Sequence, residues 1–192
     1  MRDYAMKLAA DLSDSRTGLK KNIATLLGDR HDGTARYLFS DEPRTETPGG
    51  WIRLRLVAPE LSLPATAQDT AVEVPVAVPA VGARVLCCAW VATKSKAYRA
   101  RDELSLDERV EARLRLVRGP LDEALEIEVF DGEPSGRSAV MERGSNRFAR
   151  PYGRVTAIGT VTNQERLKDL MEQGLGVARC YGFGLLDVVE ME

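Results

Sequence analysis

The stretch QGLGVARCYGFGLL, residues 173–186, carries four glycines and one arginine close to the end of the chain. A dinucleotide-binding loop has the spacing G-x-G-x-x-G between a strand and the helix that the loop opens. Here Arg179 stands three positions after Gly176, and the stretch follows an expected helix and enters the expected last strand. A phosphate loop is also excluded, because no G-K followed by Ser or Thr closes it. Neither nucleotide-binding motif therefore accounts for the glycines.

What the glycines permit is a long turn in which the backbone comes close to a neighbour. Such a turn exposes N–H groups and, with Arg179, offers one cation to RNA phosphates. A tight helix-to-strand connection packed on a sheet explains any single glycine equally well. Both interpretations stay open at the level of the sequence.

The rest of the chain alternates short strand and helix patterns. Val, Leu, Ile and aromatic residues at every second position predict strands, and the three- or four-residue spacing of apolar residues predicts helices. Strands are expected over 4–12, 36–39, 51–57, 82–92, 125–130, 154–161 and 185–189. Helices are expected between the capping residues 13–15 and Gly28, over 106–117 up to Gly119-Pro120, and over 164–171, with a turn-rich segment at 131–153.

This order predicts an α+β fold of two tandem ferredoxin-like (RRM-like) domains with a C-terminal glycine-rich loop. The expected domains span 1–96 and 97–192, the second carrying a basic segment and the loop. A chain of 192 residues is long enough to bury cores of its own.

Composition narrows the class of protein further. The chain has three cysteines, of which Cys87 and Cys88 are adjacent, so it has neither a disulfide framework nor a CxxC metal pair. We expect no cofactor and no metal site. No window approaches the roughly 18 apolar residues of a membrane span, and the first residues lack the apolar stretch of a secretory signal, so we expect a cytoplasmic protein.

The formal net charge of −2 hides a segregated distribution. Residues 94–101 hold four cations and no acid, and residues 132–154 hold five arginines and two acids. Residues 102–131, in between, hold ten acids and four arginines. This pattern excludes a uniformly basic nucleic-acid binder but allows a local groove for an anionic ligand. Two solvated basic loops would give the same pattern.

Taken whole, the glycine-rich stretch resembles the C-terminal loop of the CRISPR-associated repeat endoribonucleases, in particular the CasE branch of type I-E systems. That branch ends Q-G-[IL]-G-x-[AG]-[KR]-x-x-G-x-G-L-L. The chain matches this pattern at ten positions: Gln173, Gly174, Leu175, Gly176, Ala178, Arg179, Gly182, Gly184, Leu185 and Leu186. Residues 157–161 and the helix after them, the segment 84–96 and the strand 36–39 resemble further parts of the family, less strongly.

The resemblance implies two ferredoxin-like domains that bind the hairpin of a CRISPR repeat transcript. Family members cut at the 3′ base of the hairpin without a metal, by attack of the ribose 2′-hydroxyl on the adjacent phosphate. They often stay on the mature guide and join other CRISPR-associated subunits in an interference complex. A local arginine groove suits a hairpin that is held through phosphate and 2′-hydroxyl contacts.

The chain departs from the family at the catalytic position. The family keeps a histidine at the start of the first helix in a pattern like Y-x-x-H-x-x-L, and aligning this pattern on Leu19 puts Arg16 at the histidine position and Ser13 at the tyrosine position. The only histidine is His31, in the loop that follows. Arginine is a poor proton-transfer group, but its guanidinium can hold a phosphorane. Repeat-processing proteins of type IV systems are thought to rely on arginines in this way.

These comparisons define the candidate residues. The catalytic candidates are Arg16, Ser13, Lys20, one helical turn beyond Arg16, and His31. The RNA-binding candidates are Arg36, Lys94, Lys96, Arg143, Arg147, Arg150, Gly174, Gly176, Arg179, Gly182 and Gly184. Each of them is individually compatible with a solvated surface position.

Three functions remain open on this basis. The first is metal-independent cleavage of the repeat hairpin, and the second is a subunit that binds the repeat but has lost cleavage. The third is a ferredoxin-like module that binds no nucleic acid, which leaves the ten-position match unexplained. The missing family histidine separates the first two.

Overall fold

The computed structural model describes residues 1–7, 16–28, 37–40, 51–68, 70–93, 105–143 and 145–192, without the side chains of Leu106 and Arg143. No helix in these ranges is both long and apolar enough to cross a membrane. The strands are β1 (Arg2–Lys7), β2 (Tyr37–Ser40), β3 (Trp51–Leu56), β4 (Ala71–Val74), β5 (Arg84–Ala92), β6 (Leu125–Arg143), β7 (Asn146–Val161) and β8 (Asp187–Glu190). The helices are α1 (Arg16–Leu27), α2 (Ala65–Gln68), α3 (Leu106–Leu114), α4 (Arg118–Asp122) and α5 (Gln164–Gln173), with the 3₁₀ turns η2 (Arg115–Val117) and η3 (Arg179–Tyr181).

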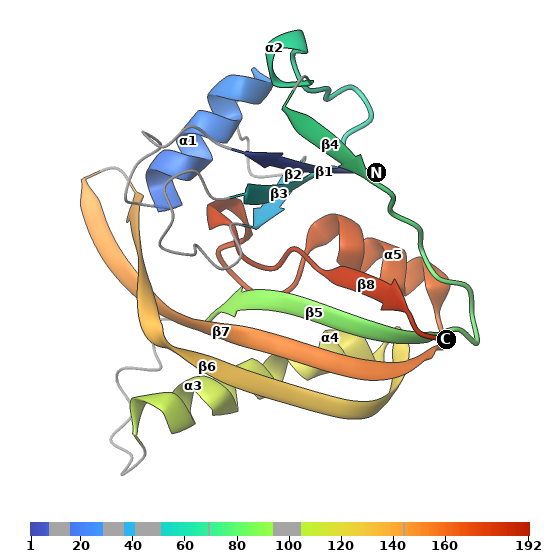
Figure 1. Ribbon diagram of the computed structural model, residues 1–192. Helices are drawn as coiled ribbons and strands as arrows, with labels where there is room; N and C mark the ends of the chain where they lie inside the picture. The colour runs from blue at the N-terminus through green and yellow to red at the C-terminus, as the bar shows by residue number, and fades with distance from the viewer. Residues whose placement is uncertain (8–15, 29–36, 41–50, 69, 94–104, 144) are drawn as a thin grey trace.

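Two four-stranded antiparallel sheets organise the chain (Figure 1). The first has the strand order β2-β3-β1-β4 and the second the order β6-β7-β5-β8. Each set of strands and helices follows the β-α-β-β-α-β order of a ferredoxin-like unit. The predicted α+β fold with two tandem ferredoxin-like units is confirmed.

Each sheet buries an apolar face under its helices. In the first unit, Leu19 and Ile23 of α1 pack with Phe39 and Leu54 of the sheet. In the second, the alternate residues Val85, Cys87, Ala89 and Val91 of β5 face the helices, with Leu114 of α3 and Leu170 of α5 in the same core. The period-two pattern of β5 thus meets the apolar stripes of two helices.

The segment 131–153, predicted as turns, is instead a long hairpin of β6 and β7, so this prediction is wrong. Pro134, Pro151 and Gly153 lie where a strand tolerates them. Pro134 lies on the edge strand at a register shift, and Pro151 lies just beyond Tyr152, the last β7 residue that pairs with β5. A Cβ at Gly153 would lie 2.5 Å from Leu114 Cδ1, so this glycine lets α3 approach the sheet. In Figure 1 the hairpin rises from the second sheet toward α1.

The predicted helix stop at Gly119-Pro120 is also wrong, because both residues lie inside α4. The chain runs from α3 through η2 directly into α4, and Pro120 occupies the first turn of α4, where its missing N–H has no intrahelical partner to lose.

The predicted first domain, residues 1–96, includes strand β5. In the structure β5 pairs with β7 and β8, so it belongs to the second sheet. The chain therefore passes from the first sheet to the second between β4 and β5.

A buried guanidinium joins the two units. Arg55 of β3 and Asp3 of β1 are register partners, both 0% exposed, and they form a two-pronged ion pair with N–O distances of 2.7 Å. The Arg55 Nη1 atom also donates to the carbonyl oxygens of Met171 at 3.0 Å and Leu186 at 2.8 Å. Arg55 thus binds α5 and the end of the glycine-rich stretch to the first sheet.

Replacing Arg55 by Met should lower the free energy of unfolding by about 3–5 kcal/mol, because Asp3 would then be a buried charge without its main partner. Urea denaturation of the wild type and the variant measures the difference. Arg115→Met is the control, since Arg115 forms an exposed ion pair with Glu111 and its loss should change little. A similar, small loss in both variants would contradict this role of Arg55.

Candidate active site and RNA-binding surface

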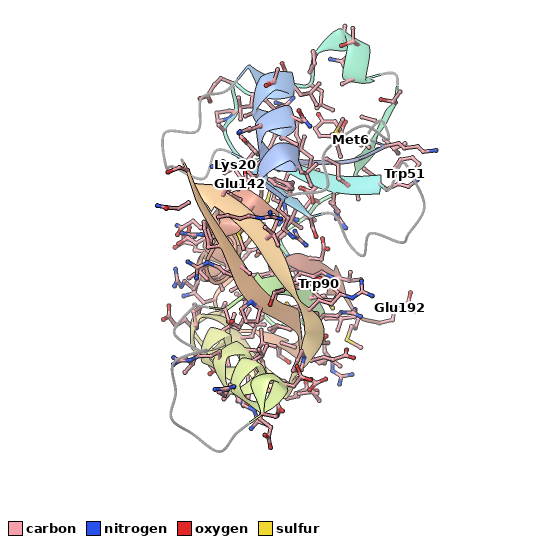
Figure 2. All side chains as sticks on the ribbon, turned by 90° about the vertical axis from the view of Figure 1, so that its left-hand side faces the viewer. Met6, Lys20, Trp51, Trp90, Glu142 and Glu192 are labelled. Carbon is pink, nitrogen blue, oxygen red and sulfur yellow. The ribbon has the colours of Figure 1, made fainter. Side chains whose placement is uncertain are left out.

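Three segments distant in sequence meet where the first unit contacts the second. They are the start of α1, the tip of the β6–β7 hairpin and the turn η3 within the glycine-rich stretch. The Glu142 amide of the hairpin donates to Thr17 Oγ1 of α1 at 2.7 Å, and the Tyr181 hydroxyl of η3 donates to the Glu142 carbonyl at 3.0 Å. Figure 2 shows Lys20 and Glu142 together at this junction.

Arg16 lies at the start of α1 and points at the glycine-rich stretch. Its Nη1 atom donates to the carbonyl oxygens of Tyr181 at 3.2 Å and Gly182 at 3.1 Å. Its guanidinium carbon lies 4.0 Å from the ring centroid of Phe183 and 5.5 Å from that of Tyr152. Carbonyl oxygens and ring faces hold a guanidinium in place. A positioned cation results.

Lys20 lies one helical turn after Arg16 and reaches the same stretch. Its Nζ atom is 4.9 Å from the ring centroid of Tyr181. The two residues therefore share a face of α1, as their spacing predicted. Two cations from one helix stand beside η3.

Aromatic side chains form the base of this site. Tyr152 packs between Trp90, at 5.7 Å, and Phe183, at 5.3 Å between ring centroids. Phe183 is fully buried in a small cluster with Met141 of the hairpin. The rings under Arg16 therefore come from β7 and the glycine-rich stretch, and Trp90 of β5 packs against them through Tyr152.

The four glycines of the glycine-rich stretch are required by their backbone conformation and by the lack of space for a side chain. Gly174, Gly176, Gly182 and Gly184 all have φ between +71° and +83°. A Cβ at Gly182 would lie 2.6 Å from Phe39 and 2.9 Å from Arg16 Nη1, and one at Gly184 would lie 2.1 Å from the Leu175 carbonyl oxygen. Only glycine fits these positions without a shift of the backbone or of the neighbour.

The amides of three of these glycines are used within the chain. Gly174 donates to Leu170, Gly182 to Arg179 and Gly184 to the Trp90 carbonyl at 2.6 Å. This favours the packed helix-to-strand connection, one of the two interpretations drawn from the sequence. Contact of these glycines with RNA stays a prediction.

Arg179 faces a different part of the surface from Arg16. Its Nη1 atom donates to the carbonyl oxygen of Gln173 at 2.7 Å, and the residue lines a cavity together with Gly174 and Gly176. The structure therefore brings Arg16, Lys20 and Gly182 together, and it places Arg179, Gly174 and Gly176 at a neighbouring cavity.

The hairpin arginines differ in exposure. Arg147 is exposed near the tip, where its register partner is Glu142. Arg150 is half-buried, with Nη1 donating to the Thr93 carbonyl at 3.3 Å and its guanidinium 5.4 Å from the Phe148 ring. Arg143 pairs with Asn146 at the end of β6. Arg147 is thus better placed than Arg150 to contact a ligand without loss of a structural contact.

Several candidates lie outside the described residues. These are Ser13, His31, Arg36, Lys94 and Lys96. Their roles stay predictions.

Sequence reasoning missed Tyr181, Phe183 and Thr17, which complete the site. Tyr181 and Phe183 occupy variable positions of the glycine-rich motif, so the motif gave no signal for them. An aromatic residue between closely spaced glycines was the only available hint.

Cys87 is excluded as a nucleophile, because burial and, to a lesser extent, the neighbouring Cys88 thiol raise the pKa of Cys87 to about 12. Among the described residues, no three His, Cys, Asp or Glu side chains gather in a way that could hold a metal ion.

Solved structures with the same arrangement of elements identify the fold. Cas6e, a CRISPR-associated protein from Escherichia coli K-12, is 18% identical, with a TM-score of 0.68 over 100% of both chains. The chain has the Cas6e fold. Cse3 from Thermus thermophilus, bound to an RNA representing a pre-cleavage complex, is 15% identical, with a TM-score of 0.64 over 98% of this chain and 100% of that one.

A chain of a CRISPR RNA-guided surveillance complex is also similar, at 14% identity and a TM-score of 0.66, over 98% of this chain and 100% of that one. No family model and no curated protein matches the sequence. The likeness thus extends along almost the whole chain in structure while the sequences have diverged widely.

The glycine-rich stretch is anchored where it enters β8. Arg53 Nη1 lies 2.9 Å from Asp187 Oδ1, and Arg53 Nη2 lies 3.3 Å from Asp3 Oδ2. Burial raises the pKa of the Asp187 carboxyl; Arg53 and Arg55 oppose this shift, and Asp3 adds to it. Because the pKa is raised, the folded protein binds this proton more tightly than the unfolded chain does.

The wild type should therefore lose stability relative to Asp187→Asn as the pH rises from the ordinary carboxyl pKa, about 3.9, through the raised folded value. Below this window the stabilising contribution of the bound proton is fully present, and above it the contribution is lost. Urea denaturation of both proteins between about pH 3 and pH 7 measures the difference. A difference that is constant, or that moves in favour of the wild type with rising pH, would contradict the raised pKa.

Proposed function

We propose that the protein is an endoribonuclease that binds the hairpin of CRISPR repeat RNA and cuts at its 3′ base. The observation that carries this proposal is the convergence of Arg16 and Lys20 with the hairpin tip and η3 in a chain with the Cas6e fold. The start of α1 is also the place where the resembled family keeps its catalytic histidine.

The site suits a reaction in which negative charge builds up on phosphorus. Arg16 is held by two carbonyl oxygens and two ring faces, so its charge needs little reorganisation when a phosphorane forms. Lys20 adds a second positive charge and an N–H donor one helical turn away. Stabilisation of the transition state by fixed cations is thus the main contribution of the protein.

The reaction is an internal transesterification of RNA. The 2′-hydroxyl loses its proton, the O2′–P bond forms, the P–O5′ bond breaks, and O5′ takes up a proton. The ammonium of Lys20 donates that last proton, and the first passes to solvent. This chemistry yields a 2′,3′-cyclic phosphate and a 5′-hydroxyl, with no metal in the proposed reaction.

The hairpin tip supports RNA binding beside this site. Arg147 is exposed there, and phosphate and 2′-hydroxyl contacts dominate the recognition of RNA stems. The similarity to a chain of an RNA-guided surveillance complex supports retention of the protein on the mature guide, together with other CRISPR-associated subunits.

The bonds of Arg16 favour a second candidate, a subunit that binds the repeat without cutting it. Its guanidinium donates to two carbonyl oxygens and stacks on Phe183, which is also a structural role. Such a subunit would cap the 3′ hairpin of the guide. Cleavage by the wild type decides between the two candidates.

The purified protein should cut repeats from its own genomic neighbourhood at one position, equally with and without EDTA. Mass spectrometry of the products should find the 2′,3′-cyclic phosphate and 5′-hydroxyl ends. An unrelated hairpin of equal length is the control. Loss of activity in EDTA, or a 3′-hydroxyl product, would contradict the mechanism, and tight binding without cleavage would favour the capping subunit.

Arg16→Ala should slow single-turnover cleavage by a factor of about 10²–10³, the effect of losing one fixed transition-state donor. Arg16→Lys should restore only part of the rate, because an ammonium keeps the charge but not the planar fork. Repeat affinity should change much less than the rate.

His31→Ala is the matched comparison, and its rate should stay closer to that of the wild type. The rate should also rise with pH without an inflection near about 6.5, the ordinary histidine pKa. A fully active Arg16→Ala protein beside an inactive His31→Ala protein would reverse the assignment. Melting curves of each variant exclude loss of fold as the cause.

A further inference from the structure

A cavity of about 430 Å³ lies between the helices of the second unit and the glycine-rich stretch. We name it the Arg179 cavity. The helical segment α3–η2–α4 forms one wall and α5 another, and residues 174–177 and Arg179 close it. This volume lies in the range of pockets that hold small organic ligands.

One part of the lining is apolar. Leu116, Val117, Leu170 and Val177 contribute to it. Leu116 of η2 is 66% exposed, which is unusual for a large aliphatic side chain, and it lines the cavity. An inorganic anion gains nothing from contact with an apolar wall, whereas the face of an aromatic ring packs favourably against one.

The other part of the lining is cationic. Arg113, Arg166 and Arg179 contribute side chains, and no Asp or Glu of the described residues belongs to the lining. Arg166 is ion-paired with Glu123 at 2.7 Å, outside the cavity. The Arg179 guanidinium is held by backbone carbonyls, which position it without neutralising it. Arg113 and Arg179 therefore make the cavity attractive to a phosphate.

The cavity and the candidate active site share one short piece of backbone. Arg179 lines the cavity, and the carbonyl oxygen of Tyr181, two residues on, accepts from Arg16. Two residues span at most about 7 Å between Cα atoms. An RNA strand next to Arg16 thus comes within reach of the cavity a few nucleotides further along.

We propose that the Arg179 cavity receives one unpaired ribonucleotide that flanks the repeat hairpin. The base lies against the apolar wall of Leu116 and Val177, and a phosphate binds Arg113 and Arg179. Unpaired, unstacked bases are what proteins read in RNA, with guanidinium planes among the stacking partners. The inference rests on the proposed function and adds a second contact point outside the stem.

Fluorescence anisotropy with three repeat RNAs tests this proposal: the bare hairpin, the hairpin with short single-stranded flanks on either side, and the flanked hairpin with abasic sugars in the flanks. The wild type should bind the flanked RNA on the order of tenfold more tightly than the bare hairpin, or about 1.4 kcal/mol. Abasic flanks should lose most of this gain.

Arg113→Gln and Leu116→Gln should each remove the gain from the flanks and leave the affinity for the bare hairpin unchanged. Both side chains are exposed, so the fold should tolerate the changes. Arg115→Gln is the matched control, because Arg115 is a neighbouring exposed arginine that pairs with Glu111 and does not line the cavity.

The outcomes separate this inference from the proposed function. Failure of the wild type to bind any repeat hairpin would overturn both. Hairpin binding with no gain from the flanks, an equal gain with abasic flanks, or equal weakening of all RNAs by Arg113→Gln would overturn the cavity alone. Binding of free nucleoside monophosphates, lost in Arg113→Gln, without any gain from the flanks would assign the cavity to a free nucleotide instead.

Discussion

The guanidinium of Arg55 is the contact on which the arrangement of the molecule depends. It is fully buried, pairs with Asp3 inside the first sheet, and donates to the backbone of α5 and of the glycine-rich stretch in the second unit. A buried charge of this kind is costly unless all its partners are in place. The two units are therefore held in one relative position, with the glycine-rich stretch fixed between them.

That position determines what Arg16 contacts. The helix α1 belongs to the first unit, whereas the hairpin tip and η3 belong to the second, so the site exists only when the units are docked. The bonds of Thr17 to Glu142 and of Arg16 to Tyr181 and Gly182 all cross this boundary. Gly182 admits a close approach to Phe39 and Arg16 there that no larger residue would allow.

Local patterns predicted both ferredoxin-like units, because strand alternation and helix spacing report burial within one unit. They did not predict contacts between units. The alternation of residues in β3 places Arg53 and Arg55 on the face of the strand opposite its apolar residues. The sequence of β3 gives no sign that the second unit covers this arginine-bearing face. The long hairpin was missed because Pro134, Pro151 and Gly153 are typical of turns, although bulges, strand edges and the approach of α3 also accommodate them. Arg16 was identified only through the resemblance to the repeat endoribonucleases. Its distant partner Tyr181 was not predicted.

A structure of the protein with its own repeat hairpin, carrying a 2′-deoxyribose at the cleavage position, tests the central claim most directly. We expect the base of the stem to lie against the tip of the β6–β7 hairpin and the scissile phosphate to contact the Arg16 guanidinium, with Lys20 on the side of the leaving oxygen. A stem bound elsewhere, with Arg16 far from any phosphate and still bound to the Tyr181 and Gly182 carbonyls, would contradict it.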